Sequence, residues 1–297
     1  MSNTPRIALA TAAEVATLDD EGQLLAHELT RRGALVEPAV WDDSDVRWAT
    51  YDLVVVRSTW DYPAHLGQFL AWAEHVAGVT RLANGPALLR WSTDKRYLRE
   101  LARAGIPVVP STFVTSADGS AHPLIGTEHV VKPSVSAGSR DTVRLGPEDA
   151  DRSAAHVRAI LDSGRTAMVQ PYLADVDTAG ESAVLFLEGA YSHAVRKAAI
   201  LTRGAGLVEG LFAAEEITSL TPGEPELALA RRVVAHVRAA GHQAPLYCRV
   251  DLLPTAEGPV VLEVELAEPS MFLTFAPGSA ARFADAILLR AGEAADP

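Results

Sequence analysis

The stretch Cys248–Pro269, which reads CRVDLLPTAEGPVVLEVELAEP, carries the most information about how this chain folds and what it binds. Two apolar runs, Tyr247–Leu253 and Val260–Leu266, flank a turn-like segment that contains Glu257-Gly258. Apolar runs of this length on either side of a short polar segment predict an antiparallel β-hairpin.

Strand side chains alternate between two faces, so Arg249 and Asp251 share one face of the first strand, and Glu263 and Glu265 share one face of the second. A loop centred near Glu257 places Asp251 roughly opposite Glu263. The opposite face is expected to point into a core, and its members are Val250, Leu252, Leu262, Val264 and Leu266.

Three carboxylates are thus expected to converge beside one arginine. At an effective dielectric constant of about 20, two like charges about 4 Å apart repel each other by about 4 kcal/mol, so a cation is needed among them. Oxygen ligands alone suit Mg²⁺, which makes Asp251, Glu263 and Glu265 candidate metal ligands. The alternative is a solvated hairpin face whose acidic side chains simply meet water.

The composition is that of an ordinary globular protein, with 297 residues, 48% hydrophobic and 22% charged. Such a length supports one large domain or two to three lobes. The net charge of −12 argues against a nucleic-acid or anionic-membrane partner. A single cysteine, Cys248, excludes an intramolecular disulfide and a Cys-rich zinc site. The start of the chain lacks the apolar region of a signal peptide and no long apolar run occurs, so we expect a cytoplasmic protein.

Strands and helices alternate at the N-terminus, which predicts a parallel α/β lobe with ligands at the carboxyl ends of its strands. The motif RSTWDY, Arg57–Tyr62, stands at such an end. Arg57 can hold a carboxylate as a two-pronged donor, and Asp61 can accept from an ammonium. Ser270 is a further candidate for the substrate pocket by its position. Alternatively, the aromatic residues are core and Arg57 forms a local ion pair with Asp61. The expected elements are the strands Arg6–Thr11, Leu35–Val40 and Leu53–Arg57 and the helices Asp19–Arg32 and His65–Val76.

Two later stretches carry lysines in unusual settings. Lys95 is expected in the first turn of a helix over Asp94–Ala104, where the helix dipole disfavours a cation, so a ligand anion or simple solvent exposure must account for it. Lys132 ends a predicted strand and precedes a loop of small residues, Ser134–Arg140, whose backbone N–H groups can approach phosphate oxygens. No Walker A or GxGxxG pattern occurs, which excludes a P-loop nucleotide site and the usual dinucleotide-binding motif.

The rest of the sequence predicts further strands and helices. It contains no histidine spacing typical of a metal site and no GxSxG nucleophile motif. A glycine-rich stretch within Ala198–Ala213 is expected to cover a site, and the last residues are expected to fray. The expected elements are a helix over 147–162, a strand Ala167–Pro171, a hairpin of Glu181–Leu187 with Ala190–Lys197 across Glu188-Gly189, and helices Glu224–Ala240 and Gly278–Ala291.

Taken in chain order, these motifs resemble the ATP-grasp superfamily, above all its glutathione-synthetase and RimK-like ligases. The resemblance implies a mixed α/β fold with an N-terminal parallel α/β lobe over 1–92, a small central lobe over 93–170 and a C-terminal antiparallel-sheet lobe over 171–297. The motifs are TDK at Lys95, VVKP at Lys132, MVQPYL at Met168–Leu173, GE at Glu181, RVD at Arg249–Asp251 and LEVE at Leu262–Glu265.

The resemblance also implies a role for each matching residue. Two Mg²⁺ ions would be held by Asp251, Glu263 and Glu265, although the family usually has Asn where this chain has Glu265. The expected ATP contacts are the phosphate-binding Lys95 and Lys132, the flap Ser136, Gly138 and Ser139, the adenine hinge Gln170, Tyr172 and Leu173, and Glu181 or Asp177 for the ribose. Lys197 would reach the terminal phosphates, and Arg249 the phosphoryl group in transfer.

The activity that the resemblance implies is an ADP-forming ligase that joins a carboxylate to an amine through an acyl phosphate. The strings RSTWDY, STDKRYL and EVELAEPS resemble more narrowly the ATP-grasp cyclo-ligases that close O-ureido-D-serine to D-cycloserine, releasing ADP, phosphate, CO₂ and ammonia. The expected partner is therefore a small, amino-acid-like molecule. Three alternatives stay open: an intermolecular amino-acid or peptide ligase, a non-catalytic nucleotide-binding regulator, and a kinase that stops at the phosphoryl stage. Whether the chain forms a homo-oligomer also stays open.

Overall fold

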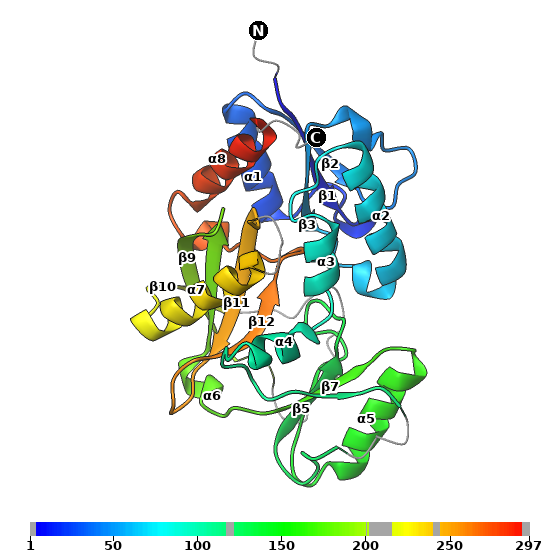
Figure 1. Ribbon diagram of the computed structural model, residues 1–297, viewed down its shortest axis with the longest axis vertical. Coiled ribbons are helices and arrows are strands. Elements are labelled where there is room, and N and C mark those ends of the chain that lie inside the picture. Colours follow the sequence, from blue (N-terminus) through cyan, green and yellow to red (C-terminus); the bar gives the residue numbers. More distant parts are fainter. Residues whose placement is uncertain (1–3, 117–121, 200, 202–215, 240–243, 293–297) are drawn as a thin grey trace.

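The computed structural model describes residues 4–116, 122–199, 201, 216–239 and 244–292, and the expected covering loop and frayed tail fall largely outside them. Three sheets follow one another down the long axis of the molecule (Figure 1). The first is parallel and the other two are antiparallel. The predicted mixed α/β class is therefore confirmed. Among the described helices, none combines the length and apolar character needed to cross a membrane.

The N-terminal sheet has the strand order β2–β1–β3 and is covered by helices on both faces. Its central strand is apolar and buried along nearly its whole length, as expected for a parallel sheet with two covered faces. The C-terminal helix α8 packs beside α1 on this sheet (Figure 1), so the end of the chain completes the N-terminal lobe. The elements are β1 (Arg6–Thr11), α1 (Asp20–Arg31), β2 (Leu35–Val40), β3 (Leu53–Ser58), α2 (Leu66–Val79) and α8 (Ser279–Gly292), with 3-10 turns at Ala13–Val15, Trp48–Thr50 and Tyr62–Ala64.

The small sheet is antiparallel, with the order β4–β7–β5–β6, and one helix, α5, packs against it. Val131 and Val169 on the sheet and Val157 and Ile160 on the helix form its separate core. The elements are β4 (Thr112–Val114), β5 (His129–Pro133), β6 (Val143–Leu145), α5 (Ala150–Asp162) and β7 (Ala167–Pro171). Sequence analysis missed the two three-residue strands, which are too short to show a period.

The five-stranded sheet has the order β10–β9–β8–β11–β12. Alternate residues of β8 and β11 face α7 on one side, where Phe186, Val250 and Val234 share a core. On the other side Leu185 and Tyr247 join the core of α1 and α8. The elements are α6 (Val176–Ala179), β8 (Glu181–Leu187), β9 (Ala190–Lys197), β10 (Ile217–Leu220), α7 (Glu224–Ala239), β11 (Tyr247–Leu253), β12 (Val260–Glu265) and a 3-10 turn at Leu273–Phe275.

The predicted hairpin is present, and Asp251 pairs with Glu263 as expected from the alternation. A β-bulge after Asp251 shifts the register, so that Leu252 pairs with Val261. Val261 consequently enters the core, and Leu262 lines the cleft described below. The expectation that Leu262 points into the core is wrong, because an extra residue in one strand reverses the faces beyond it.

The helix expected over Asp94–Ala104 is also corrected. The chain forms α3 (Pro86–Ser92), with its proline at the first position, and then α4 (Tyr97–Arg103). Lys95 lies in the turn between them, where its backbone N–H donates to the carbonyl of Ser134 at 2.9 Å. The helix-dipole reasoning for Lys95 therefore does not apply, since its backbone is held by the loop after β5.

Candidate active site

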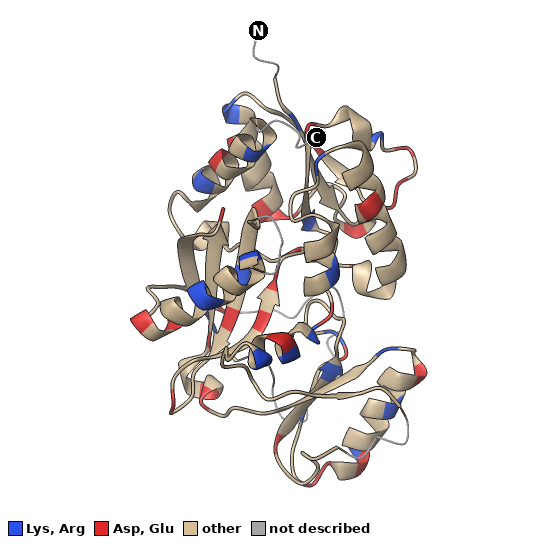
Figure 2. Ribbon diagram, viewed as in Figure 1, with Lys and Arg blue, Asp and Glu red and all other residues tan. Residues whose placement is uncertain are grey.

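A cleft of about 740 Å³ lies between the three sheets, with walls from the small sheet, the five-stranded sheet and the N-terminal lobe. Figure 2 shows acidic positions on the strands of the five-stranded sheet at the centre of the molecule. The residues predicted for ATP, metal and catalysis line this cleft together, with the exception of Asp177. The cleft therefore gathers residues that are up to 170 positions apart in the chain.

All lysines of the chain lie in this cleft. The sequence has three, Lys95, Lys132 and Lys197, and their exposed fractions are 4%, 8% and 7%. Lysine is almost never buried to this extent unless it is paired, so three buried lysines in one cavity indicate a place for negative charge.

Lys95 is held by one carboxylate and by the loop after β5. Its ammonium lies 3.0 Å from a carboxylate oxygen of Glu263 and donates to the carbonyl and hydroxyl of Ser136 at 3.0 and 3.3 Å. Burial opposes the charge of Lys95, but Glu263 outweighs it and raises the pKa above its usual value. Lys95 is therefore a charged group that ties the loop to the hairpin.

Lys132 is different, because its ammonium has no hydrogen bond or ion pair with any described residue. Burial lowers its pKa, and the neighbouring lysines lower it further, against the opposing effect of Glu263. A buried ammonium without a partner is costly, so Lys132 is the group in the cleft with most to gain from an anion.

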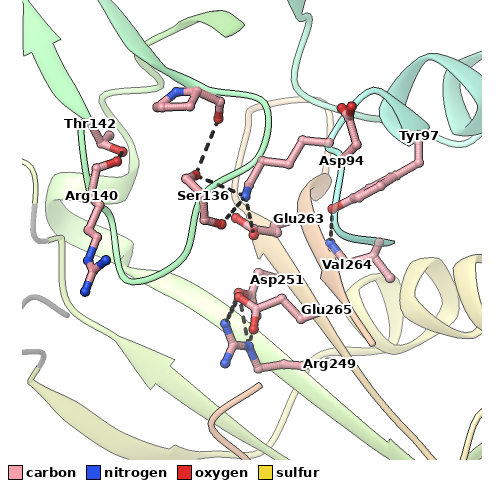
Figure 3. A network of polar contacts seen from close by, with 12 residues as sticks. Asp94, Tyr97, Ser136, Arg140, Thr142, Arg249, Asp251, Glu263, Val264 and Glu265 are labelled. Carbon is pink, nitrogen blue, oxygen red and sulfur yellow. Dashed lines mark hydrogen bonds and ion pairs between the residues drawn. The ribbon is translucent and has the colours of Figure 1, made fainter. Parts of the chain in front are cut away.

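Arg249 and Lys197 neutralise the carboxylates of the hairpin. Arg249 donates to both oxygens of Asp251, each at 2.9 Å, and also pairs with Glu265 (Figure 3). Lys197 lies 3.2 Å from Asp251 and also pairs with Glu181. Each carboxylate at this end of the cleft therefore has a cationic partner.

These pairs decide which carboxylates stay ionised. Burial alone would raise the pKa of Asp251, but Arg249 and Lys197 outweigh it and bring the value to about 2. Burial dominates at Glu265 and Glu181, whose pKa values rise to about 7 and about 8 despite their ion pairs. Asp251 is therefore the firmest negative charge of this group.

Of the three carboxylates expected to converge beside one arginine, Asp251 and Glu265 contact Arg249, whereas Glu263 pairs with Lys95. Across the described ranges, no group of three or more His, Cys, Asp and Glu side chains is placed to share an ion. Asp251, Glu263 and Glu265 instead turn toward Arg249, Lys197 and Lys95. Their donor chemistry nevertheless fits Mg²⁺, because they present only carboxylate oxygens to one cleft.

The hinge predicted for adenine lies between the small sheet and α6. The backbone N–H of Tyr172 donates to the backbone carbonyl of Glu128 at 3.1 Å. The backbone N–H of Leu173 has no hydrogen-bond partner among the residues described. Gln170 uses its side chain to donate to Ser111 at 3.0 Å. The cleft is apolar here, and its lining includes Val109, Val130, Leu253 and Leu262.

Asp177, the alternative to Glu181 for the ribose, does not line the cleft. Its carboxylate accepts from Arg144 at 3.1 Å and from the hydroxyl of Tyr172, on a half-exposed surface. Glu181 begins β8 and does line the cleft, so the structure favours Glu181 over Asp177.

The loop predicted as a flap borders the phosphate end of the cleft. Ser136, Gly138 and Ser139 all line it, and the last two have φ angles of 61°. Left-handed backbone at two successive residues makes a sharp turn that directs the loop over the cleft.

Two of the predicted substrate residues lie behind the cleft wall. Arg57 is 2% exposed, donates to the carbonyl of Pro269 at 3.2 Å and lies over the rings of Tyr247 and Phe283. Asp61 accepts from the indole of Trp41 at 2.9 Å. Neither residue lines the cleft, so this geometry does not support the substrate roles expected for Arg57 and Asp61, which stay predictions.

Ser270 does line the cleft, and its carbonyl accepts from Arg249 at 3.1 Å. Sequence analysis missed Glu268 and Phe272 and left Trp60 and Tyr62 as core candidates, although all four line the cleft. Glu268 had a visible signal, because it is the third carboxylate of EVELAEPS. It lies beyond the strand, where the alternation of faces no longer predicts a direction.

A family match, a curated relative and a solved structure all point to the same protein family. Residues 7–84 match the family described as "D-cycloserine synthetase DcsG, N-terminal domain". The chain is 36% identical over 295 residues to the cycloserine biosynthesis protein DcsG of Streptomyces lavendulae, covering 96% of this chain and 98% of that protein. The crystal structure of D-cycloserine synthetase DcsG superposes with a TM-score of 0.88 at 35% identity, covering 96% of this chain and 99% of the other.

More distant structures share the fold alone. A RimK domain ATP-grasp protein from Sphaerobacter thermophilus has a TM-score of 0.67 at 19% identity, covering 94% of this chain and 98% of its own. The D-alanine–D-alanine ligase from Bacillus anthracis, in complex with ATP, has a TM-score of 0.64 at 15% identity, covering 97% of each chain. The predicted ATP-grasp fold is confirmed. The chain belongs to the family of the cycloserine biosynthesis protein DcsG and is an ATP-dependent ligase of the ATP-grasp superfamily.

Proposed function

We propose that this ligase activates the carboxylate of O-ureido-D-serine with ATP and closes the molecule to D-cycloserine. The observation that carries the proposal is that the likeness to the cycloserine biosynthesis protein extends over 96% of the chain, including the N-terminal wall of the cleft. A substrate that contains its own nucleophile needs one small pocket beside the nucleotide. The cleft of about 740 Å³ has room for both.

ATP would lie along the cleft from the hinge to the hairpin. Adenine fits the apolar end between Val130 and Leu262, where the N–H of Leu173 is left to donate to it. Glu181, which begins β8 and lines the cleft, would hold the ribose hydroxyls. The phosphates would meet the three lysines, beneath a flap formed by Ser136, Gly138 and Ser139.

Mg²⁺, two ions by this proposal, would be held by Asp251, Glu263 and Glu265, and it supplies neutralisation of the phosphate charge when bound. Lys95 and Arg249, which pair with these carboxylates, would then turn to phosphate oxygens. The ion pairs hold the two cations at the phosphate end of the cleft.

The chemistry follows from the poor reactivity of a carboxylate. Transfer of the terminal phosphoryl group of ATP gives an acyl phosphate and ADP, and Arg249 is placed to stabilise the group in transfer. The ureido nitrogen bonded to oxygen attacks the acyl carbon, closes a five-membered ring and releases phosphate. Water then removes the carbamoyl group as CO₂ and ammonia. We place this reaction in the cytoplasm, where ATP is supplied.

The test is ADP release and product mass with O-ureido-D-serine as the sole substrate. We expect one D-cycloserine for each ADP, without a second amine. A strict requirement for a second amino acid or a peptide would replace the proposal with an intermolecular ligase. Release of a hydroxylamine-trappable acyl phosphate without ring closure would replace it with a kinase.

A further inference from the structure

Glu268 is a buried carboxylate at the end of the cleft nearest the N-terminal lobe. It follows β12, has an exposed fraction of 7% and lines the cleft together with Trp60 and Tyr62. The indole of Trp60 donates to the backbone carbonyl of Glu268 at 3.3 Å, which links this residue to the N-terminal lobe. Burial raises the pKa of Tyr62, and the charge of Glu268 adds to this rise.

The other acidic residues of the cleft are already engaged or exposed. At the N-terminal wall, Asp19 accepts from the N–H of Gly22, and Glu21 accepts from the N–H groups of Met271 and Leu273. Asp20 is exposed, and the hairpin carboxylates are paired with lysine or arginine. The side chain of Glu268 has no hydrogen bond or ion pair with any residue in the described part of the chain.

An unpaired carboxylate in this position is unfavourable, because burial removes its water and the neighbouring carboxylates repel it. Burial raises the pKa of Glu268 to about 8, and Glu265 adds to the rise. The arrangement becomes favourable when a cation with hydrogen-bond donors enters from the cleft. Aromatic residues also line the cleft, among them Trp60 and Tyr62, and aromatic rings attract organic cations.

We infer that Glu268 is the residue that receives the α-ammonium group of the substrate and so selects amino acids over other carboxylic acids. This rests on the proposed function and adds a specificity-determining residue to it. Among the described residues, the neighbouring cations Lys95 and Arg249 are held by the hairpin, so a donor cation that arrives with the substrate would satisfy the carboxylate. An amine kept as ammonium also has no lone pair with which to attack the acyl phosphate.

The test compares two substrates in two enzymes. O-Ureido-D-serine is set against 3-(ureidooxy)propanoate, which lacks only the amino group, and the wild-type chain is set against Glu268→Gln. We expect the wild type to prefer the amino compound by about 100-fold in kcat/KM, and the variant by less than about 5-fold, with the loss mainly in KM. The KM for ATP and the Mg²⁺ concentration for half-maximal rate should stay unchanged.

Glu257→Gln is the matched control, because it makes the same change at an exposed residue that does not line the cleft. It should keep the wild-type preference, and circular dichroism should show both variants folded. An unchanged preference in Glu268→Gln would overturn the inference. So would a raised Mg²⁺ requirement with an unchanged substrate preference, because Glu268 would then act as a metal ligand.

A second measurement separates this inference from the proposed function. If O-ureido-D-serine releases no ADP with the wild type, the proposed function fails. Glu268 is then judged by calorimetry with D-serine and 3-hydroxypropanoate in the presence of a non-hydrolysable ATP analogue. Tighter binding of D-serine to the wild type but not to Glu268→Gln supports the inference, and equal binding of the two acids by the wild type overturns it.

Discussion

The two ends of the cleft treat negative charge in opposite ways. At the hairpin end, Asp251, Glu263 and Glu265 each have a lysine or arginine partner. At the end formed with the N-terminal lobe, Glu268 has no such partner among the described residues, and the nearby Arg57 is turned into the core. By our proposal, the hairpin end would exchange its internal ion pairs for contacts with ATP and Mg²⁺, whereas the other end would be completed by the substrate.

The largest effect is expected at Asp251, the most firmly ionised carboxylate of the hairpin end. Asp251→Asn removes that charge and leaves Arg249 and Lys197 without their shared partner. We expect ADP formation to fall by about 1,000-fold and the free energy of unfolding by about 3 kcal/mol, with the chain still folded. Coupled-enzyme assay and urea unfolding measure the two effects.

Glu257→Gln, at the exposed turn of the same hairpin, is the control and should change neither quantity. Unchanged ADP formation in Asp251→Asn would show that the paired end of the cleft takes no part in the reaction. It would remove the basis for the metal assignment as well.

Lys132 sharpens the comparison, because it is the lysine at the paired end without a partner among the described residues. Lys132→Met should weaken ATP binding by about 100-fold in calorimetry, yet raise the free energy of unfolding by about 1 kcal/mol. Lys95→Met is the matched control. It should lose both ATP affinity and free energy of unfolding, because Glu263 is left unpaired. Equal ATP affinity in Lys132→Met would contradict a phosphate role.

The pH dependence of stability should separate the same two lysines. Burial lowers the pKa of Lys132 in the folded chain, so the unfolded chain binds more protons between the two pKa values. Stability from this residue therefore rises as the pH rises through the folded pKa, and the slope should vanish in Lys132→Met. The pKa of Lys95 is raised instead, so the stability that Lys95 contributes is lost as the pH rises through its pKa in the folded chain.

The hairpin could be predicted from sequence because its determinants are local. Alternation fixes the face of each residue, and the turn fixes the partner, which is why Asp251 pairs with Glu263 as expected. Leu262 was assigned to the wrong face, because a bulge depends on the fit of the strands and has no period in the sequence. The motifs around Lys95 and Lys132 likewise placed both lysines in the cleft, although the helix expected around Lys95 was wrong.

The substrate end could not be predicted because its determinants are distant in the chain. Arg57 lies near the end of β3, but the direction of its side chain is set by Tyr247, Pro269 and Phe283, which lie about 200 residues away in the chain. Glu268 is placed by the path of the chain beyond β12 and by a contact with Trp60. The sequence motifs contain both residues but do not show which of them lines the cleft.

Arg57 provides the smallest and most discriminating test of this comparison. Arg57→Gln removes a charged hydrogen bond to Pro269 and the contacts with two aromatic rings, so we expect a loss of about 2 kcal/mol in the free energy of unfolding. Two other guanidinium nitrogens, Nε and Nη1, are buried without a hydrogen bond, which keeps the loss modest. The KM of the substrate should stay within about 2-fold at temperatures where the variant is folded, because Arg57 does not line the cleft.

Arg231→Gln, on the exposed face of α7, is the control for removing an arginine and should leave stability and kinetics unchanged. A tenfold rise in the substrate KM of Arg57→Gln without a loss of stability would return Arg57 to the substrate pocket. It would also mean that this end of the cleft has its own cation, Arg57. Arg57 could then neutralise Glu268, and the contrast between the two ends would disappear. The same pair of variants therefore tests both the position of Arg57 and the reason for which Glu268 needs the substrate.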